Sequence, residues 1–388
     1  MEFKRDINAQ IQKLLKYYKI IVITGARQTG KTYLAKKIFN DKEYVNLESL
    51  ENREFAISDP VGFLNKYKNG AIFDEVQNVP KLFSQIQAVA DQSEKKAQFV
   101  LTGSSNFKLL EGVTQSLAGR AGIIKIYPLS LSELSKESEV NELIINGFYP
   151  GKLKDNIPAN IFYKNYIDTY IEKDLRLLEN IKDLVLFRKF IQILAGRVGS
   201  IINFQSISND IGVSQNTIVR WIRLLEVSYI TYTLPPWFSN ISKRLVKQPK
   251  IYFNDVGLLV NILGISNTQQ LQTHPLYGFI FENFIINELF KHVNNYNYNL
   301  NLNFYRSYDG QEVDLIFVKD NKYNLLEIKS SHTFHSSFLR GVKSFEKISN
   351  RKIDKKIIIL GSKYNQKRAD FMISNYKDMI KDLFTKSN

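Results

Sequence analysis

The feature that most constrains the fold is a glycine-rich loop near the amino terminus. An apolar run predicts a strand over residues 20–24, and a helical pattern follows over residues 33–38. The loop between them has the pattern G-x-x-x-x-G-K-[ST] and consists of Gly25, Ala26, Arg27, Gln28, Thr29, Gly30, Lys31 and Thr32. A strand, such a loop and a helix together form a phosphate cradle, because loop N–H groups and the helix amino terminus face the anion. We expect Lys31 to reach the β- and γ-phosphates of ATP and the Thr32 hydroxyl to bind Mg²⁺.

Two adjacent carboxylates follow a second apolar run, which predicts a strand over residues 71–73. Asp74 is expected to hold Mg²⁺ through its water shell, and Glu75 to polarise the attacking water. Adjacent acids at this place favour hydrolysis over nucleotide binding alone.

Two further residues are candidates for the same site. Ser104 follows the predicted strand at residues 98–102, where a γ-phosphate or lytic water would lie in a parallel sheet, although an ordinary Ser/Asn turn explains it nearly as well. Arg120 stands in a Gly-flanked loop. It is either an arginine finger acting across a subunit interface or a solvated loop residue.

Composition limits the other classes of site. The chain has 388 residues with 53 Lys and Arg against 38 Asp and Glu, so its formal net charge is +15. This surplus favours polyanionic partners, nucleic acid first and an anionic membrane second, unless it reflects coding bias. Cysteine is absent, which excludes disulfides, Cys-ligated zinc, iron–sulfur clusters and thiol catalysis. With four histidines, any metal site should be built from carboxylates.

The first residues, MEFKRDINAQ, lack the apolar stretch of a signal peptide. The longest apolar runs have the length of strands, and none approaches the roughly 20 residues of a transmembrane helix. We therefore expect a cytoplasmic protein without a membrane partner.

Several motifs occur in a characteristic order: GARQTGKT, AIFDE, FVLTGSSN, SLAGRAG and YPLSLSEL. The region that carries them resembles the AAA+-like ATPase domain of a large family of prokaryotic ATPases. The later stretches FENFIINEL, EVDLIFV and LLEIKSS are similar to that family's C-terminal domain of unknown function. The resemblance implies an ATPase core, a middle winged-helix element and a restriction-endonuclease-like C-terminal fold, and it favours a functional role for Arg120.

The alternation of strands and helices independently predicts an α/β class with a parallel sheet. Combined with the resemblance, the expected fold is an AAA+-like P-loop NTPase, then a helical and winged-helix region, then a restriction-endonuclease-like α/β domain. The expected domains are an ATPase domain at 1–135, a helical connector at 136–200, a winged helix-turn-helix at 201–265 and a PD-(D/E)xK nuclease-like domain at 266–388.

The winged-helix prediction depends on two helices, over residues 204–211 and 215–225, joined by a short turn. Strands over residues 229–234 and 251–253 would form the wing, with the basic residues Lys243, Arg244, Lys247 and Lys250 between them. The outward face of the second helix carries residue types that read bases and phosphates: Gln215, Asn216, Thr217, Arg220 and Arg223. A lid or packing module is the alternative for this unit.

Carboxylates near the C-terminus follow the order of the PD-(D/E)xK fold. Glu282 lies in a predicted helix at 276–292, Asp314 in a strand at 312–318, and Glu327 and Lys329 in a strand at 325–330. Period-two alternation puts Glu327 and Lys329 on one side of their strand. Asp314 and Glu327 could then bind a divalent cation, completed by Glu282, with Lys329 orienting water. The alternatives are an exposed charged face, or an inactive nuclease fold kept for DNA binding or assembly.

Three hypotheses follow. The first is a Mg²⁺-dependent ATPase that couples hydrolysis of ATP to DNA binding or remodelling, as a homo-oligomer if Arg120 acts in trans. The second is an ATP-regulated, metal-dependent DNA nuclease in genome defence. The third is a nucleotide-controlled switch or scaffold that binds a protein partner.

Overall fold

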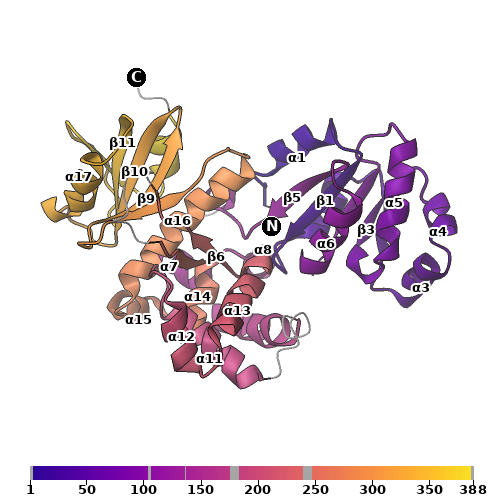
Figure 1. The fold of residues 1–388 in the computed structure, drawn as a ribbon, viewed down its shortest axis with the longest axis horizontal. Helices are drawn as coiled ribbons and strands as arrows, with labels where there is room; N and C mark the ends of the chain where they lie inside the picture. Colours follow the sequence, from indigo (N-terminus) through magenta and orange to yellow (C-terminus); the bar gives the residue numbers. More distant parts are fainter. Residues whose placement is uncertain (1–2, 104–105, 136, 175–182, 239–246, 386–388) are drawn as a thin grey trace. The chain divides into compact units, whose positions relative to one another are not determined.

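The computed structural model describes residues 3–103, 106–135, 137–174, 183–238 and 247–385, which form two compact units (Figure 1). The N-terminal unit contains the residues up to Leu129 together with Tyr149–Asp155 and Val227–Tyr229. The C-terminal unit contains Ser130–Phe148, Asn156–Glu226 and the residues from Ile230 onward. Ser104, Lys243 and Arg244 lie outside the described residues.

The N-terminal unit is built on a five-stranded sheet with the order β2-β3-β4-β1-β5, and all of its pairs are parallel. The strands are β1 (Ile20–Gly25), β2 (Glu43–Asn46), β3 (Ala71–Asp74), β4 (Phe99–Thr102) and β5 (Ala121–Ile126). Three of them, β1, β3 and β4, are buried along their whole length, as expected for a parallel sheet covered on both faces.

Helices cover both faces of this sheet (Figure 1). One apolar cluster joins the sheet to α1 (Asn8–Leu15) and α2 (Lys31–Ile38). The other joins it to α3 (Leu50–Ser58), α4 (Pro60–Lys66), α5 (Lys81–Gln92) and α6 (Asn106–Ser116). A 3₁₀ turn (Val76–Asn78) follows β3, and α8 (Pro150–Lys154) belongs to the same unit. The predicted α/β P-loop class is therefore confirmed.

The first part of the C-terminal unit is helical. It contains a 3₁₀ turn (Leu131–Glu133), α7 (Val140–Asn146), α9 (Ala159–Tyr166), a π-helix (Ile167–Asp174), α11 (Leu184–Ala195), α12 (Phe204–Ile211), α13 (Gln215–Val227), α14 (Val256–Ile262) and α15 (Thr268–Thr273). Two strands, β6 (Thr231–Leu234) and β7 (Lys250–Phe253), pair antiparallel. The helix pair α12–α13 followed by this two-stranded sheet matches the element order expected of the middle region.

A six-stranded mixed sheet with the order β12-β13-β11-β10-β9-β8 forms the rest of the unit (Figure 1). Its strands are β8 (Asn303–Arg306), β9 (Glu312–Lys319), β10 (Lys322–Lys329), β11 (Ile353–Leu360), β12 (Gln366–Lys367) and β13 (Met372–Asn375). The helices are α16 (Tyr277–Asn295), a 3₁₀ turn (Ser336–Leu339), α17 (Arg340–Glu346) and α18 (Met379–Phe384). The predicted helix at 276–292 and the predicted strands at 312–318 and 325–330 are present as α16, β9 and β10, within a few residues of the expected bounds.

Candidate nucleotide site

The loop between β1 and α2 needs glycine at two positions. Gly25 has φ +147°, and a Cβ atom there would lie 2.1 Å from the carbonyl oxygen of Ile126 on the neighbouring strand β5. Gly30 has φ +87° in the left-handed region and stands directly before the first turn of α2. The two glycines let the loop turn tightly between the central strand and the helix.

Lys31 is buried at the start of α2, with 8% of its surface exposed. Its Nζ donates hydrogen bonds to the carbonyl oxygens of Gly25 at 3.0 Å and Ala26 at 2.8 Å. Burial lowers the pKa of Lys31 to about 8, against the opposing effect of Glu75 and Asp74. The ammonium group thus lies within the loop that the motif assigns to phosphate.

Asp74, at the end of β3, accepts hydrogen bonds from three hydroxyl groups. Its Oδ2 lies 2.9 Å from Thr32 Oγ1 and 2.8 Å from Tyr44 Oη, and its Oδ1 accepts from Thr102 Oγ1. Burial, followed by the bond to Asp74, raises the pKa of Tyr44, so this phenol remains a donor at neutral pH. The structure therefore brings together Thr32 and Asp74, the two residues expected to hold Mg²⁺.

Sequence reasoning missed Tyr44 and Thr102. Tyr44 lies on β2 and Thr102 ends β4, and β2 and β4 are the two neighbours of β3 in the sheet. The available signal for Thr102 was its place at the carboxyl end of a strand that flanks the one carrying Asp74, where ligands bind in parallel sheets. Tyr44 is the second residue of β2 and is paired with Ile72, so its position in the strand gave no such signal.

Glu75 follows Asp74 in the left-handed conformation, with φ 55°. Its Oε2 accepts a hydrogen bond from Gln77 Nε2. Gln77 in turn packs against Gly103, since a Cβ atom on that glycine would lie 2.1 Å from Gln77 Oε1. Gln77 was also missed from the sequence, and it fixes the direction of the Glu75 carboxylate.

Arg120 lies at the opposite end of the sheet from the loop. β5 runs parallel to β1 with Ala121 beside Ile20 and Ile126 beside Gly25, so about 16 Å of strand separates Arg120 from the loop. Its guanidinium binds both carboxylate oxygens of Asp91, at 2.5 and 2.9 Å, which lowers the pKa of Asp91. Within its own chain, Arg120 is therefore paired with Asp91 and remote from the loop.

Helix α13 presents the polar face that the sequence predicts. Gln215, Asn216, Arg220 and Arg223 are exposed, and Thr217 is half-buried. The Ser214 hydroxyl accepts a hydrogen bond from the N–H of Thr217 at 3.1 Å, as a helix N-cap does.

Lys250 does not belong to a basic wing, contrary to expectation. Only 2% of its surface is exposed, and its Nζ binds Glu282 Oε1 at 2.9 Å and also contacts Glu312. Burial opposes its charge, but Glu282, Glu312 and Asp314 together raise the pKa of Lys250. The lysine is an internal counter-ion that binds two carboxylates.

The C-terminal carboxylates are only partly assembled as predicted. Lys329 Nζ lies 2.6 Å from Glu327 Oε1 and 3.3 Å from Asp314 Oδ2, and Asp314 Oδ2 also accepts the N–H of Ile328 at 2.7 Å. Burial and the nearby Asp314 raise the pKa of Glu327 well above its ordinary value. Asp314, Glu327 and Lys329 thus form one cluster.

Glu282 does not join this cluster as a third ligand. Its Oε1 is bound by Lys250 and by the Tyr252 hydroxyl at 2.6 Å. Among the described residues, no group of three or more His, Cys, Asp or Glu side chains is placed to hold a metal ion. The prediction that Glu282 completes a three-carboxylate site is corrected accordingly, because Glu282 binds the buried Lys250 of β7 instead.

Family models match most of the chain in three separate segments. Residues 17–135 match the AAA domain, residues 137–269 a domain of unknown function (DUF8612), and residues 277–378 a second domain of unknown function (DUF4143). The first match spans the loop, the Asp74–Glu75 pair and Arg120, on the parallel sheet described above. The N-terminal unit contains an AAA-type P-loop domain.

Curated relatives of the chain carry no assigned activity in their names. An uncharacterized protein of Mycobacterium tuberculosis is 28% identical over 290 residues, which cover 74% of this chain and 65% of that protein. An uncharacterized protein of Haemophilus influenzae is 25% identical and covers 93% of this chain and 94% of that protein. A third, from Methanocaldococcus jannaschii, is 26% identical, with coverage of 90% and 83%.

Solved structures give weaker likenesses. The Walker-type ATPase PABY2304 of Pyrococcus abyssi has a TM-score of 0.44 at 13% identity and covers 66% of this chain and 95% of that one. Thermotoga maritima RuvB has a TM-score of 0.30 at 15% identity, with coverage of 59% and 89%. No helix in the part of the chain that the structure describes is long and apolar enough to cross a bilayer.

The AAA domain offers Mg²⁺ the oxygen donors that this ion prefers, a hydroxyl and a carboxylate. Thr32 Oγ1 and Asp74 Oδ2 already lie 2.9 Å apart, and each hydrogen bond to Asp74 comes from a neutral group. In the described residues no cationic side chain forms an ion pair with Asp74 that a metal ion would have to displace. The residues present in the AAA domain therefore fit Mg²⁺ bound together with a nucleotide.

Proposed function

We propose that the protein hydrolyses ATP to ADP and phosphate with Mg²⁺, and that it couples this reaction to binding or remodelling of DNA. The carrying observation is the 2.9 Å contact between Thr32 Oγ1 and Asp74 Oδ2, with Glu75 next in the chain. It joins the end of the phosphate loop to the acidic pair on one edge of the sheet.

Five residues of the AAA domain have a role in this reaction. Lys31, now bound to two loop carbonyls, would turn to the β- and γ-phosphates of ATP. Thr32 and Asp74 would hold Mg²⁺, whose bound charge offsets that of the phosphate oxygens. Glu75 would accept a proton from the attacking water while Gln77 keeps its carboxylate in position.

We further propose that the protein works as a homo-oligomer with Arg120 acting on the nucleotide of a neighbouring copy. Arg120 lies about 16 Å of strand from its own loop, so it would need another subunit to contact a γ-phosphate. Asp91 would hold the guanidinium until that contact forms.

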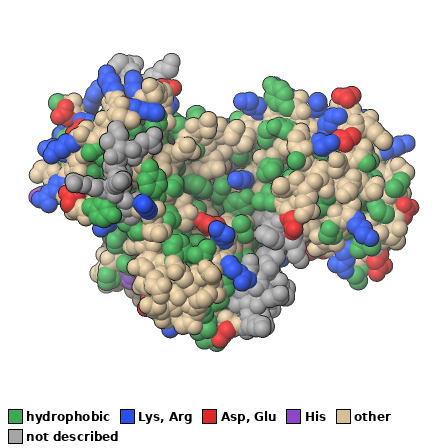
Figure 2. Space-filling view, in the orientation of Figure 1, with side chains coloured by type: hydrophobic (Ala, Val, Ile, Leu, Met, Phe, Trp, Pro, Cys, Tyr) green, Lys and Arg blue, Asp and Glu red, His purple; other side chains and the backbone are tan. Residues whose placement is uncertain are grey.

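Two observations support DNA as the partner. The net charge of +15 favours a polyanion, and Figure 2 shows Lys and Arg side chains spread over the surface of both units. Exposed Gln, Asn and Arg side chains on α13 have the chemistry to contact base edges and phosphates. Helix α13 would be the contacting element.

The test is ATP turnover with single-stranded, duplex and branched DNA at two salt concentrations. We expect DNA to stimulate turnover, salt to weaken the stimulation, and Glu75→Gln to abolish turnover, whereas Glu54→Gln, which alters an exposed acid of α3, should change nothing. Arg220→Ala with Arg223→Ala should lose the stimulation, while Lys13→Ala with Lys16→Ala, which removes equal charge near α1, should keep it. Slow turnover indifferent to DNA would instead favour the nucleotide-controlled switch that binds a protein partner.

A second candidate function, ATP-regulated DNA cleavage, is favoured by one observation. Glu327 Oε2 is buried and has no hydrogen-bond partner among the described residues, beside Asp314 and Lys329. A divalent cation bound by Asp314 and Glu327 would satisfy this oxygen. Incubation of DNA with Mg²⁺ or Mn²⁺ tests the idea, and cleavage that persists after Glu327→Ala with Lys329→Ala would refute it.

A further inference from the structure

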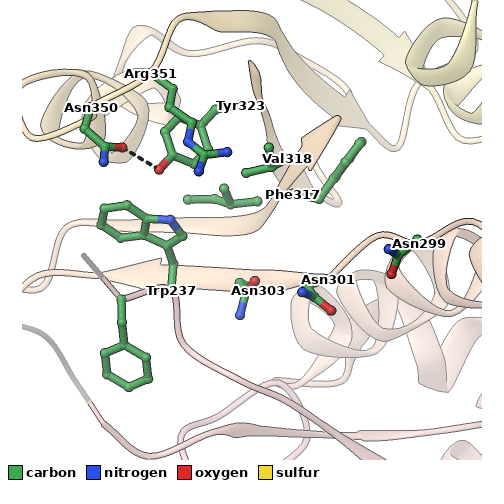
Figure 3. A pocket seen from close by; sticks show the side chains of 11 residues that line it. Trp237, Asn299, Asn301, Asn303, Phe317, Val318, Tyr323, Asn350 and Arg351 are labelled. Atoms are coloured by element: carbon green, nitrogen blue, oxygen red, sulfur yellow. Dashed lines mark hydrogen bonds between the residues drawn. The ribbon is translucent and has the colours of Figure 1, made fainter. Parts of the chain in front are cut away.

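The C-terminal unit has a pocket of about 510 Å³ at the β8 edge of its six-stranded sheet (Figure 3). This volume lies in the range of small-molecule sites. Among the described residues, the lining contains no acidic side chain and one basic side chain, that of Arg351. The pocket is separate from α13 and from the Asp314–Glu327–Lys329 cluster, none of which lines it.

One side of the pocket is a row of three amides. Asn301 and Asn303 alternate in sequence with the buried Leu302, so these two side chains share a side of the segment that enters β8. Asn299 precedes them at a tight turn, in which the N–H of Leu300 donates to the carbonyl oxygen of Tyr298 at 2.9 Å. Figure 3 shows them following one another along the segment that leads into β8. Asn299 and Asn301 are exposed and make no hydrogen bond to any residue that the structure describes. The amides of Asn299 and Asn301 each offer donors and an acceptor to a ligand, whereas the Asn303 amide nitrogen already donates to the carbonyl oxygens of Pro235 and Pro236, at 3.4 Å each.

Aromatic rings form the end of the pocket next to Asn303. The Trp237 indole packs edge-on against Tyr323, with ring centroids 5.8 Å apart, which fixes its plane. Phe238, the next residue, leaves 57% of its surface exposed. Trp237 is itself buried, with 8% of its surface exposed, so the exposed Phe238 ring is the surface on which a flat ligand can stack.

Positive charge lies on the opposite side. The Arg351 guanidinium lies 6.0 Å from the centre of the Tyr323 ring, and the Tyr323 hydroxyl donates to Asn350 at 2.9 Å (Figure 3). The same loop carries the exposed Lys347 and Lys352. The pocket thus combines stacking rings, amides and a basic rim.

We propose that this pocket binds an unpaired nucleobase of a single-stranded nucleic acid. A base presents a flat face for Phe238 and a polar edge for the asparagines, next to the mostly buried Trp237, and its phosphates lie within reach of basic residues such as Arg351. Asparagine pairs well with the edge of adenine, so adenine is the preferred base. The inference rests on the proposed function only in taking a nucleic acid as the partner.

The lining residues that the structure describes include no acidic side chain, which favours this ligand over a basic peptide. A duplex does not fit the proposal, because its bases are stacked and paired and cannot offer a face and an edge to one pocket. The site would therefore distinguish single-stranded or distorted DNA from a regular duplex, a role that α13 does not supply.

The chain offers an internal reporter for the test. It has two tryptophans, Trp221 and Trp237, so the variant Trp221→Phe leaves Trp237 as the sole indole. This variant is titrated without ATP with an octamer of deoxyadenylate and, separately, with an abasic octamer of equal phosphate number at the same salt. We expect the adenine octamer to quench Trp237 fluorescence and to bind about tenfold more tightly than the abasic strand.

Variants locate the effect in the pocket. Phe238→Ala and Asn301→Ala in the same background should each weaken binding of the adenine octamer about tenfold and leave the weak abasic binding unchanged. Tyr308→Ala, which removes an exposed ring between β8 and β9 outside the lining, is the matched control and should bind normally.

Equal affinity for the adenine and abasic strands, or normal binding by both pocket variants, would overturn the proposal. A quench by a peptide but not by DNA would also overturn it. Because the titration uses no ATP and no duplex, base-dependent binding in a protein without DNA-stimulated turnover would refute the proposed function and leave this site standing. If DNA stimulates turnover, the pocket variants leave that stimulation intact, and no base-dependent quench is seen, this site would be refuted and the proposed function would stand.

Discussion

Replacing Lys250 by methionine tests whether this lysine is an internal counter-ion or a surface contact for DNA. Methionine keeps much of the length and apolar character of the side chain but removes the charge that Glu282 and Glu312 share. Removing one partner of a buried ion pair costs about 3–5 kcal/mol, because the remaining charge stays buried without compensation. We expect the free energy of unfolding of the C-terminal unit to fall by about that amount.

Both tryptophans, Trp221 and Trp237, lie in the C-terminal unit, so their fluorescence during urea unfolding follows that unit alone. The double variant Lys250→Met with Glu282→Gln serves as the control. This double variant also removes the uncompensated acid, and the amide oxygen that replaces the carboxylate at position 282 can still accept a hydrogen bond from the Tyr252 hydroxyl. It should therefore regain most of the lost stability.

The loss should also depend on pH. Burial raises the pKa of Glu282 above its ordinary value, and Lys250 opposes that rise. Because the folded state then holds a proton that the unfolded state has released, stability falls as pH rises from about 4.3 through the folded pKa. Without Lys250 the pKa of Glu282 rises further, so the deficit should be smaller at pH 5 than at pH 8.

A stability loss below about 1 kcal/mol, or one equal at both pH values, would refute the assignment of Lys250 as a buried counter-ion. Loss of DNA binding with unchanged stability would restore the view that Lys250 belongs to a basic wing.

Three predictions concern the AAA domain. Tyr44→Phe removes one hydroxyl donor from Asp74, so turnover should require several-fold more Mg²⁺ in a titration of ATP hydrolysis, while the fold is unchanged by circular dichroism. Arg120→Ala should bind ATP normally by equilibrium dialysis yet turn it over slowly. Mixing it with a Lys31→Ala protein should recover part of the activity, since one subunit then supplies the arginine and the other the intact loop, and no recovery would exclude action in trans. Gly25→Ala should fail to yield folded AAA domain by limited proteolysis, because the added methyl group would lie 2.1 Å from a backbone oxygen of β5.

Local patterns predicted the fold around the candidate nucleotide site. The loop motif, its strand and its helix are contiguous, so Lys31 and Thr32 could be placed from ten or so residues of sequence, and a carboxylate ending an apolar strand located Asp74. The parallel sheet could also be predicted, because strands and helices alternate along the sequence of the N-terminal unit. Each of these features depends on neighbours in the chain.

What the sequence did not predict depends on packing between distant elements. Gln77 differs from other glutamines only by its contact with Glu75 and Gly103, and Asp91 differs from other acids only by its ion pair with Arg120. Lys250 was placed in a basic wing because basic residues precede it. Its real partners, Glu282 and Glu312, stand 32 and 62 positions later in the chain, where no local pattern could show the pairing.

The two carboxylate sites differ in how their charge is balanced, and this difference decides where a divalent cation would bind first. Asp74 in the AAA domain accepts hydrogen bonds from neutral hydroxyls, which a metal ion can replace or share without separating opposite charges. Asp314 and Glu327 instead share the ammonium group of Lys329. A metal ion entering there must compete with a cation already in contact with both acids, in a buried setting where separating charges is costly. We therefore expect the AAA domain to be the stronger Mg²⁺ site, and this difference supports the proposal of ATP hydrolysis over that of strand cleavage.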